Sequence, residues 1–329
     1  MSNEAVIESG NVKYWQSLTG KEFKEIDKSK AVVTVTCSPM EVHGPHLPVM
    51  TDNCESEGIT TLTIKKISGK RPEILFLRLP PLYVAADVLP QTGSLMFRNS
   101  TIIRVLSDLG QTLSKQGFRD IWVASFHGGP RHFVAIEHAC HKTNRKYGAR
   151  MVSLFSLLIR LLTEGTPDLS KVLGNIPGLN PADLEGDTHA GVVETSMMLR
   201  LMGDRVDPVY KNLPRRTVDL KLMMDGLKPR AQGVGKSSII DLMRGFKAAL
   251  MYFKDETYSG APASGSAEMG DRILDVLSGH CVDALSRLLA GEITPEECHS
   301  PVWRFRWIFL IPMIGRVFEW AVGYKNPIF

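Results

Sequence analysis

Short apolar runs rich in β-branched residues alternate along this chain with longer segments in which apolar residues recur every three to four positions. This alternation is typical of α/β proteins built around a mostly parallel sheet. Three of the short runs have the composition of buried strands, namely Ala31–Cys37, Ile74–Leu79 and Asp120–Phe126. The pattern therefore predicts an α/β fold with these three strands in its central sheet.

Segments with helical periodicity fill much of the remaining chain. They cover Asn99–Gln116, Arg131–Tyr147, Ala190–Met202 and Ala267–Leu289. The run Met151–Leu158 is apolar throughout, so its periodicity leaves open whether it is a strand or a helix. Residues 163–186, which are rich in Pro, Gly and Asn, are predicted to form a long loop, and residues 204–236 are also predicted to be loop-like.

Composition excludes several classes of protein. A chain of 329 residues that is 43% hydrophobic can bury a large core in one big domain or two. The 39 basic and 35 acidic residues are mixed along its length, without the basic cluster typical of nucleic-acid binding, so we expect no nucleic-acid partner. Five scattered cysteines without a C-x-x-C pair, and an N-terminus without an apolar signal region, favour the cytoplasm.

The segment Pro39–Asp52 directly follows the first predicted strand and is the most informative part of the sequence. Glu41 and His43 are two residues apart, so they project to the same side of extended backbone. The glycine and prolines that follow bend the chain, which can bring Asp52 back toward them. Such mixed oxygen and nitrogen ligands suit zinc, manganese or iron, and an aspartate can bridge two ions. The alternative is a polar loop with an internally hydrogen-bonded histidine.

A second candidate lies at the end of the third predicted strand. His127 follows Phe126 there and is itself followed by Gly128 and Gly129. Ligands of open α/β sheets bind at the carboxyl ends of the strands. The two glycines allow the backbone to turn close to whatever His127 holds. The alternative is a structural histidine.

A third candidate is the segment Gly186–Ser196, at the start of a predicted helix. His189 and Glu194 are five residues apart, which is compatible with His189 on the preceding loop and Glu194 in the first helical turns. Glu194 could then bind metal while His189 moves protons. The alternative is a helix entry in which Asp187 or Thr188 caps the N-terminus.

Together the three segments resemble the signatures of the creatininase (creatinine amidohydrolase) family. The matching stretches are M-E-V-H-G-P-H-L-P-V-x-T-D, H-G-G and D-x-H-A-G-x-x-E-T-S, in the family's order. Thr92-Gly93-Ser94 and Gly260-Ala261-Pro262-Ala263-Ser264 resemble lesser motifs of the same family. The resemblance implies a three-layer α/β/α sandwich and a hydrolase that cleaves a C–N bond in a small amide, often cyclic or formylated.

The resemblance also implies a role for individual residues around two divalent cations, Zn, Mn or Fe. The implied ligands are Glu41 and His127 for one ion, His43 and Glu194 for the other, and Asp52 as a bridge between them. His189 is implied to transfer protons. Residues implied to support the ligands or to contact substrate are His46, Gly128 and Gly129. Two such cations activate a water and polarise the amide carbonyl, and His189 can protonate the departing nitrogen.

Two departures from the family pattern bear on the substrate. Creatininase has a glutamate ligand two residues after the histidine that matches His127, whereas this chain has Gly129. Glu194 is therefore expected to supply that carboxylate, as in the deformylase-like branch of the family. The commoner H-G-G-N motif ends here in Pro130, which removes an amide side chain from the site. Alternatives within the fold are hydrolysis of a C–C bond in a cyclic diketone or of a peptide bond, and a further alternative is an inactive metal-binding scaffold.

We expect residues 1–300 to form the hydrolase domain and residues 301–329 an apolar C-terminal tail. Residues 303–324 combine three tryptophans with an apolar run that arginines and a glutamate interrupt. The uninterrupted run Trp307–Gly315 is far shorter than the roughly 20 residues that a membrane helix needs. The tail is predicted to pack against the body or against a neighbouring subunit of a homo-oligomer. Contact with a membrane surface is the alternative.

Overall fold

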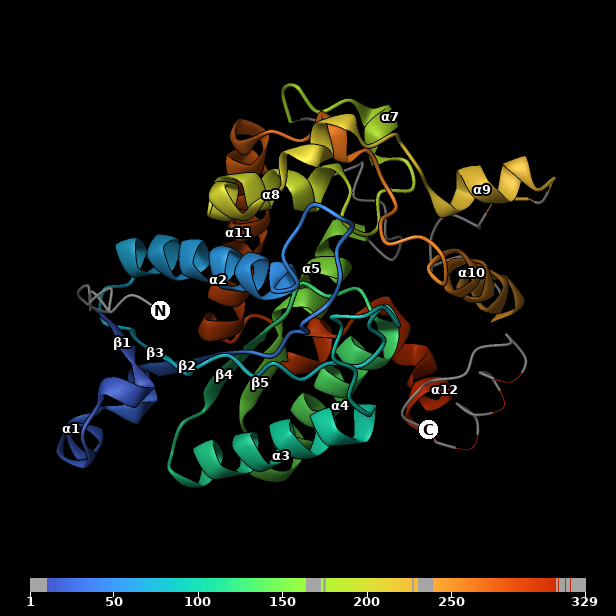
Figure 1. The fold of residues 1–329 in the computed structure, drawn as a ribbon. Coiled ribbons are helices and arrows are strands. Elements are labelled where there is room, and N and C mark those ends of the chain that lie inside the picture. The colour runs from blue at the N-terminus through green and yellow to red at the C-terminus, as the bar shows by residue number, and fades with distance from the viewer. Residues whose placement is uncertain are drawn as a thin grey trace.

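The structure is a computed structural model that describes residues 11–163, 173, 176–226, 228–229, 239–311, 313, 317 and 320. Its centre is a five-stranded sheet in the order β1-β3-β2-β4-β5, and every neighbouring pair is parallel (Figure 1). The strands are β1 (Val12–Tyr14), β2 (Ala31–Thr36), β3 (Leu75–Arg78), β4 (Asp120–Ala124) and β5 (Arg150–Ser153). The predicted α/β fold with a mostly parallel sheet is confirmed.

Helices cover both faces of this sheet (Figure 1). One layer consists of α3 (Asn99–Lys115) and α4 (Pro130–Tyr147), and the other of α2 (Thr51–Lys70), α5 (Leu154–Thr163), α8 (Val192–Met202) and α11 (Ala267–Ala290). Val33 and Ile121 pack in the core cluster on the α3 side, whereas Val32 and Trp122 pack in the cluster on the α11 side. Adjacent strand residues thus face opposite layers, as the two-residue period of a strand requires. The architecture is the expected three-layer α/β/α sandwich.

Five further α-helices of the described residues lie outside these layers. They are α1 (Gly20–Glu25), α7 (Pro181–Leu184), α9 (Val218–Met224), α10 (Ile239–Tyr252) and α12 (Arg306–Leu310). The run Met151–Leu158, which the sequence pattern could not assign to a strand or a helix, contains both. Strand β5 ends at Ser153 and helix α5 begins at Leu154. Helix α7 occupies the described end of the predicted loop 163–186, most of whose first half lies outside the described residues.

Helix α9 is a correction to the sequence analysis, which predicted residues 204–236 to be loop-like. The hydroxyl of Thr217 accepts a hydrogen bond from the N–H of Leu220 and so caps a short helix. Such a cap stabilises a helix even where apolar periodicity is weak. Residues 227 and 230–236 of the predicted loop lie outside the described part of the chain.

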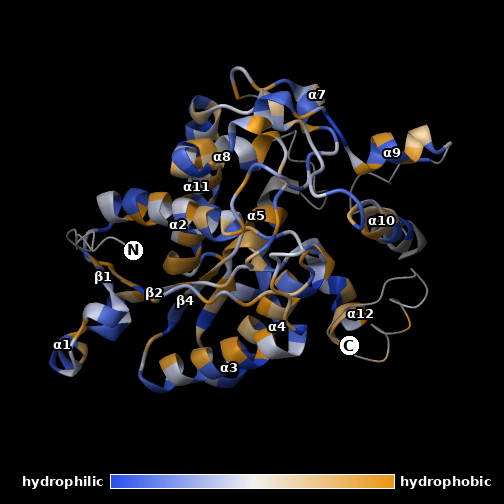
Figure 2. Cartoon of the chain, viewed as in Figure 1, coloured by the Kyte–Doolittle hydropathy of each residue, from blue (hydrophilic) through white to orange (hydrophobic). Residues whose placement is uncertain are grey.

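Helices α8 and α11 cross in backbone contact. A Cβ atom at Gly270 would lie only 1.9 Å from the carbonyl oxygen of Ser196, so only glycine allows this approach. The ion pair between Arg200 and Asp271, with 2.8 Å between Nε and Oδ1, joins the same two helices at the surface. Helix α11 therefore fixes the position of α8. Figure 2 shows the mixture of hydrophobic and hydrophilic residues along the covering helices, for example along α3.

The first part of the C-terminal tail packs on the body of the protein. Ile308 and Phe309 of α12 are buried in a cluster with Phe133 and Val134 of α4. The backbone N–H of Ser300 donates a hydrogen bond to the buried carboxyl group of Glu137. Within the described ranges, none of the helices has both the length and the apolar character that crossing a bilayer would require.

Glu137 is expected to make stability depend on pH. Burial raises the pKa of its carboxyl group from 4.5 to about 7. Because the folded protein keeps the proton that the unfolded chain releases, this contribution is complete below pH 4.5 and is lost as the pH rises through about 7. The shift corresponds to about 3 kcal/mol. The free energy of unfolding can be measured with urea near pH 5 and about pH 8. We expect it to fall less between these two pH values in Glu137→Gln than in the parent protein. Equal slopes in the two proteins would contradict this.

Candidate metal centre

A cluster of acidic and histidine side chains lies where the two central strands end. Strands β2 and β4 are adjacent and parallel, so the segments that follow them emerge side by side. The first segment carries Glu41 and His43, and the second carries His127. Asp52 lies in the first turn of α2 and Glu194 in the first turn of α8. A helix N-terminus carries partial positive charge, which stabilises both carboxylates.

The side chains form two groups that share Asp52. In the first group, Nδ1 of His127 lies 3.0 Å from Oε2 of Glu41 and 3.9 Å from Oδ2 of Asp52. In the second group, Nε2 of His43 lies 3.5 Å from the same Asp52 oxygen and 3.7 Å from Oε2 of Glu194. Within each group, one nitrogen or oxygen atom per residue lies within 4.8 Å of the others. The structure thus brings together all five residues that the sequence analysis put forward as ligands.

Backbone groups orient the side chains of both groups. His43 donates from Nδ1 to the carbonyl oxygen of Glu41 at 3.0 Å, and His127 donates from Nε2 to the carbonyl of Ala86 at 3.0 Å. A carbonyl oxygen only accepts hydrogen bonds, so these contacts fix the tautomers and leave the opposite ring nitrogens facing the cluster. The N–H of Leu89 donates to Oε1 of Glu41, which leaves Oε2 of Glu41 in the cluster.

Three atoms that converge here have no hydrogen-bond partner among the described residues although they are buried. They are Oε2 of Glu41, Nε2 of His43 and Oδ2 of Asp52. Buried polar atoms are normally paired, and atoms left unpaired around one point are what a bound cation would satisfy. Two imidazoles and three carboxylates form a donor set suited to zinc, manganese or iron. The residues therefore fit a metal centre.

The three carboxylates favour positive charge at this position. Burial alone would lower the pKa of His43, but Asp52 and Glu194 raise it to about 10. Burial likewise opposes protonation of His127, and Glu41 raises its pKa to about 9. Protons and divalent cations compete for such sites, because an imidazole must lose its proton to bind metal.

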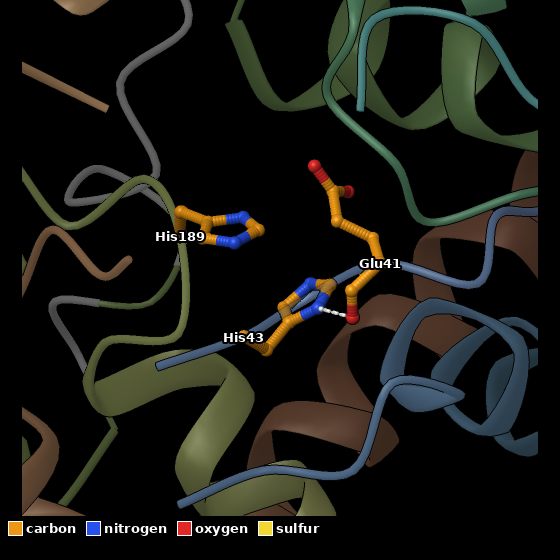
Figure 3. Close-up of side chains that lie close together, drawn as sticks. All are labelled: Glu41, His43 and His189. Atoms are coloured by element: carbon orange, nitrogen blue, oxygen red, sulfur yellow. Dashed lines mark hydrogen bonds between the residues drawn. The ribbon is translucent and has the colours of Figure 1, made fainter. Parts of the chain in front are cut away.

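His189 lies against this cluster from the loop before α8 (Figure 3). Its ring centroid is 4.1 Å from that of His43, and its Nε2 donates to the carbonyl of Val42 at 2.9 Å. The backbone of His189 forms an antiparallel bridge with Ser259, which fixes the loop. Burial and the nearby His43 lower the pKa of His189 to about 3. One ring nitrogen of His189 also lies within 4.8 Å of ligand atoms of Glu41 and His43.

A sequence model of the creatininase family, described as creatinine amidohydrolase, matches residues 16–285. The chain belongs to the creatininase family. None of the curated proteins is similar enough to the chain to count as a match.

Solved creatininases share the fold at low sequence identity. A manganese creatininase is 18% identical with a TM-score of 0.56, and the match covers 84% of this chain and 98% of that one. A mutant creatininase complexed with creatine is 17% identical with a TM-score of 0.54 over 84% and 98% of the two chains. A mutant of Zn-Zn type is 16% identical with a TM-score of 0.55 over the same shares.

His46 of this creatininase family member is buried, but it belongs to neither of the two ligand groups. Its Nε2 is 2.8 Å from the hydroxyl of Thr195, the residue that follows Glu194 in α8. The loop after β2 is thereby tied to the helix that carries Glu194. Burial lowers the pKa of His46 to about 4, so the ring is neutral at pH 7. His46 thus contacts the helix that carries Glu194, and its supporting role remains a prediction.

Close packing leaves no room for a side chain at Gly129, whereas the neighbouring Gly128 has open space around it. A Cβ atom at Gly129 would lie 2.5 Å from Nε2 of His127 and 2.7 Å from Cβ of Asp87, so no glutamate fits where creatininase has one. We expect Gly129→Ala to displace the ring of His127 and to weaken metal binding about 10–100-fold. Gly128→Ala is the matched control, since nothing lies within 4 Å of a Cβ there. Titration with zinc against a chromophoric chelator measures both variants, and equal affinities would refute the expectation.

Several residues near the cluster escaped the sequence analysis. His132 is buried beside His127, with 5.3 Å between ring centroids, and its Nε2 lies 3.0 Å from the carbonyl of Cys37. Glu55 lies one helical turn after Asp52, fully buried, and neither of its oxygens has a hydrogen-bond partner among the described residues. Asp52 and Glu55 are three residues apart, which places them on one face of a helix, but the sequence pattern did not predict a helix there.

Asp187 caps the N-terminus of α8, which was the alternative interpretation of the segment Gly186–Ser196. Its Oδ2 accepts a hydrogen bond from the N–H of Val193 at 3.1 Å, at the start of α8. Glu194, in the same turn, faces His43. The two interpretations of this segment are therefore compatible, because the cap holds the helix end that presents Glu194.

Proposed function

We propose that this protein is a metal-dependent amidohydrolase that uses two divalent cations, Zn, Mn or Fe, to hydrolyse a C–N bond of a small cyclic amide or formamide. The observation that carries the proposal is the pair of ligand groups that share Asp52. Glu41 and His127 would hold one cation, His43 and Glu194 the other, and Asp52 would bridge them. Membership of the creatininase family supports the assignment to amidohydrolases.

The chemistry divides between the bound ions and the chain. Divalent cations held by these ligands would lower the pKa of a bound water and polarise the amide carbonyl. The chain itself must handle the proton, because an amide nitrogen is a poor leaving group unless it is protonated. His189 suits this task, since the carbonyl of Val42 holds its Nε2–H and leaves Nδ1 to exchange a proton. Near-complete burial of the ligand side chains keeps bulk water from competing for them.

A small-molecule substrate follows from the same arrangement. One structural neighbour is a creatininase complexed with creatine, a small molecule with carbon–nitrogen bonds. Gly128 is exposed beside His127 and carries no side chain, so it leaves room for a substrate. A cytoplasmic location, a homo-oligomeric state and the absence of a nucleic-acid partner remain predictions from the sequence.

A metal analysis combined with a substrate screen tests the proposal. Protein purified without chelators should contain about two metal ions per chain, and its zinc, manganese and iron forms should be assayed on cyclic amides, formamides and ureas. We expect hydrolysis of at least one of these classes, lost on treatment with a chelator and restored by the metal. Protein without bound metal would favour an inactive scaffold. Bound metal with cleavage only of cyclic diketones or peptides would favour the other hydrolases of this fold.

A further inference from the structure

A basic hollow lies on the side of the molecule where the C-terminal tail begins. Its volume is about 560 Å³, and the residues that line it come from α4 and α12. They are His138, His141, Lys142, Arg145, Lys146 and Arg306. None of these lining residues is acidic, although acidic and basic residues are nearly equal in number in the whole chain. Such a concentration of one charge attracts anions.

Exposed apolar side chains follow Arg306, a lining residue of this hollow, in the sequence. Trp307 follows Arg306 in α12 and is 44% exposed. Met313, Val317 and Trp320 follow in the sequence at spacings of four and three residues, and each of the three is helical and exposed. Met313 is 73% exposed and Trp320 is 83% exposed. Soluble surfaces seldom show large apolar residues in such a row unless the row contacts something.

The hollow also contains a polar atom without a partner. Nδ1 of His141 is buried and makes no hydrogen bond with any described residue. The ring centroid of the neighbouring His299 lies 5.9 Å from that of His141, and Nε2 of His299 is also buried without a hydrogen-bond partner among the described residues. The guanidinium group of Arg306 stacks on Trp303, 4.7 Å from the ring centroid, and this holds the cation at the edge of the hollow. These groups are suited to the oxygens of a phosphate.

We propose that this face, the basic hollow together with the exposed residues of the tail, binds the surface of a bilayer that contains anionic phospholipids. Tryptophans and basic residues beside an apolar helix face are the pattern of proteins that lie in the membrane interface. The basic residues would contact the headgroup phosphates while Trp307, Met313 and Trp320 enter the boundary region. A symmetric dimer through this face is disfavoured, because it would bring two copies of the basic hollow together.

Vesicle co-sedimentation of the full chain tests this proposal. The protein should pellet with phosphatidylcholine vesicles that contain phosphatidylglycerol and not with phosphatidylcholine alone. Raising the salt from about 0.1 M to about 1 M should release it, because screening shortens the range of charge interactions. Replacing Lys142, Arg145 and Lys146 by glutamine should weaken binding on the order of 100-fold, at about fivefold for each basic residue.

Matched variants separate this effect from a general loss of charge or of apolar surface. Glutamine at the exposed Lys21, Lys65 and Lys70 removes the same charge elsewhere and should leave binding unchanged. The double variant Met313→Ser with Trp320→Ser should weaken binding about tenfold or more. Its control replaces Met224 and Met251, which are exposed on α9 and α10.

Three results would overturn the proposal. The first is equal pelleting with both kinds of vesicle. The second combines two observations: the parent protein does not bind vesicles, and the Met313 and Trp320 variant elutes from a sizing column at a lower mass than the parent. Together they would make the tail a subunit interface. The third is binding of single-stranded RNA with no binding to vesicles. Metal content, measured in parallel, shows whether each variant is folded and is independent of this proposal.

Discussion

Replacing His189 by alanine is expected to lower kcat by about 10²–10⁴-fold while the metal content stays unchanged. The reason is geometric. His189 lies 4.1 Å from His43 between ring centroids, and its Nε2–H is held by the carbonyl of Val42, so the ring is positioned to exchange a proton through Nδ1. None of the four ion-pair contacts that link the five proposed ligands involves His189. Metal analysis and steady-state kinetics on the same preparation measure both quantities.

The controls for this variant distinguish proton transfer from metal binding. His280→Ala removes a half-buried histidine from α11 and should change neither kcat nor metal content. Added imidazole should restore part of the lost turnover in His189→Ala, since it can supply the missing proton carrier. If the variant instead loses metal, His189 is a ligand, as its closeness to Glu41 and His43 would allow. Unchanged turnover would remove His189 from the mechanism.

Replacing Asp52 by alanine is expected to abolish metal binding and, with it, hydrolysis. Asp52 is the residue common to both ligand groups, so its loss removes a ligand from each cation. The affinity should fall by more than the about 10–100-fold typical of residues that only support a ligand. Glu194→Ala should behave differently, because Glu194 belongs to one group only, and about one ion per chain should remain.

The Asp52 prediction needs a check on folding. Removal of Asp52 loses its contacts with His43 and His127 but relieves repulsion among the neighbouring carboxylates, so the variant should still fold. Circular dichroism of the metal-free proteins tests this directly. Asp108→Ala, at an exposed position on α3, is the matched control and should keep two ions. Unchanged metal content in Asp52→Ala would refute the bridging role and would require a different ligand set.

The central strands and most helices of the two layers, including α3, α4, α8 and α11, could be predicted from sequence because their patterns are strong. The run Ala31–Cys37 is apolar and β-branched, and it became β2 with one residue fewer. Helix α3 has a clear apolar face, and its predicted end at Gln116 is one residue from the observed end. The candidate site could also be predicted, because Glu41, His43 and His127 lie in the segments that follow β2 and β4. The division of ligands between two ions came from the resemblance to creatininases and not from periodicity.

Other parts could not be predicted because their stability comes from tertiary contacts. Helix α2 has a weak apolar pattern, because its buried face mixes three isoleucines with Asp52, Glu55, three threonines and one serine, so hydrophobic periodicity does not reveal it. Strand β1 is only three residues long and depends on pairing with β3. His132 gains its place beside His127 from hydrogen bonds to Cys37 and Ser125, which are distant in sequence or unremarkable in pattern.

The crossing of α8 and α11 determines when the site can assemble in a growing chain. Synthesis proceeds from the N-terminus, and domains tend to fold in that order. A nascent chain that ends after β4 and His127 already contains one complete ligand group, but it lacks Glu194. When Glu194 has emerged, α8 can pack on α2 and bond to His46, but its close contact with α11 at Gly270 forms only after α11 has been made. If the proposed division of ligands holds, we expect the second ion to bind late in synthesis, and a product that ends before Glu194 to hold one cation at most.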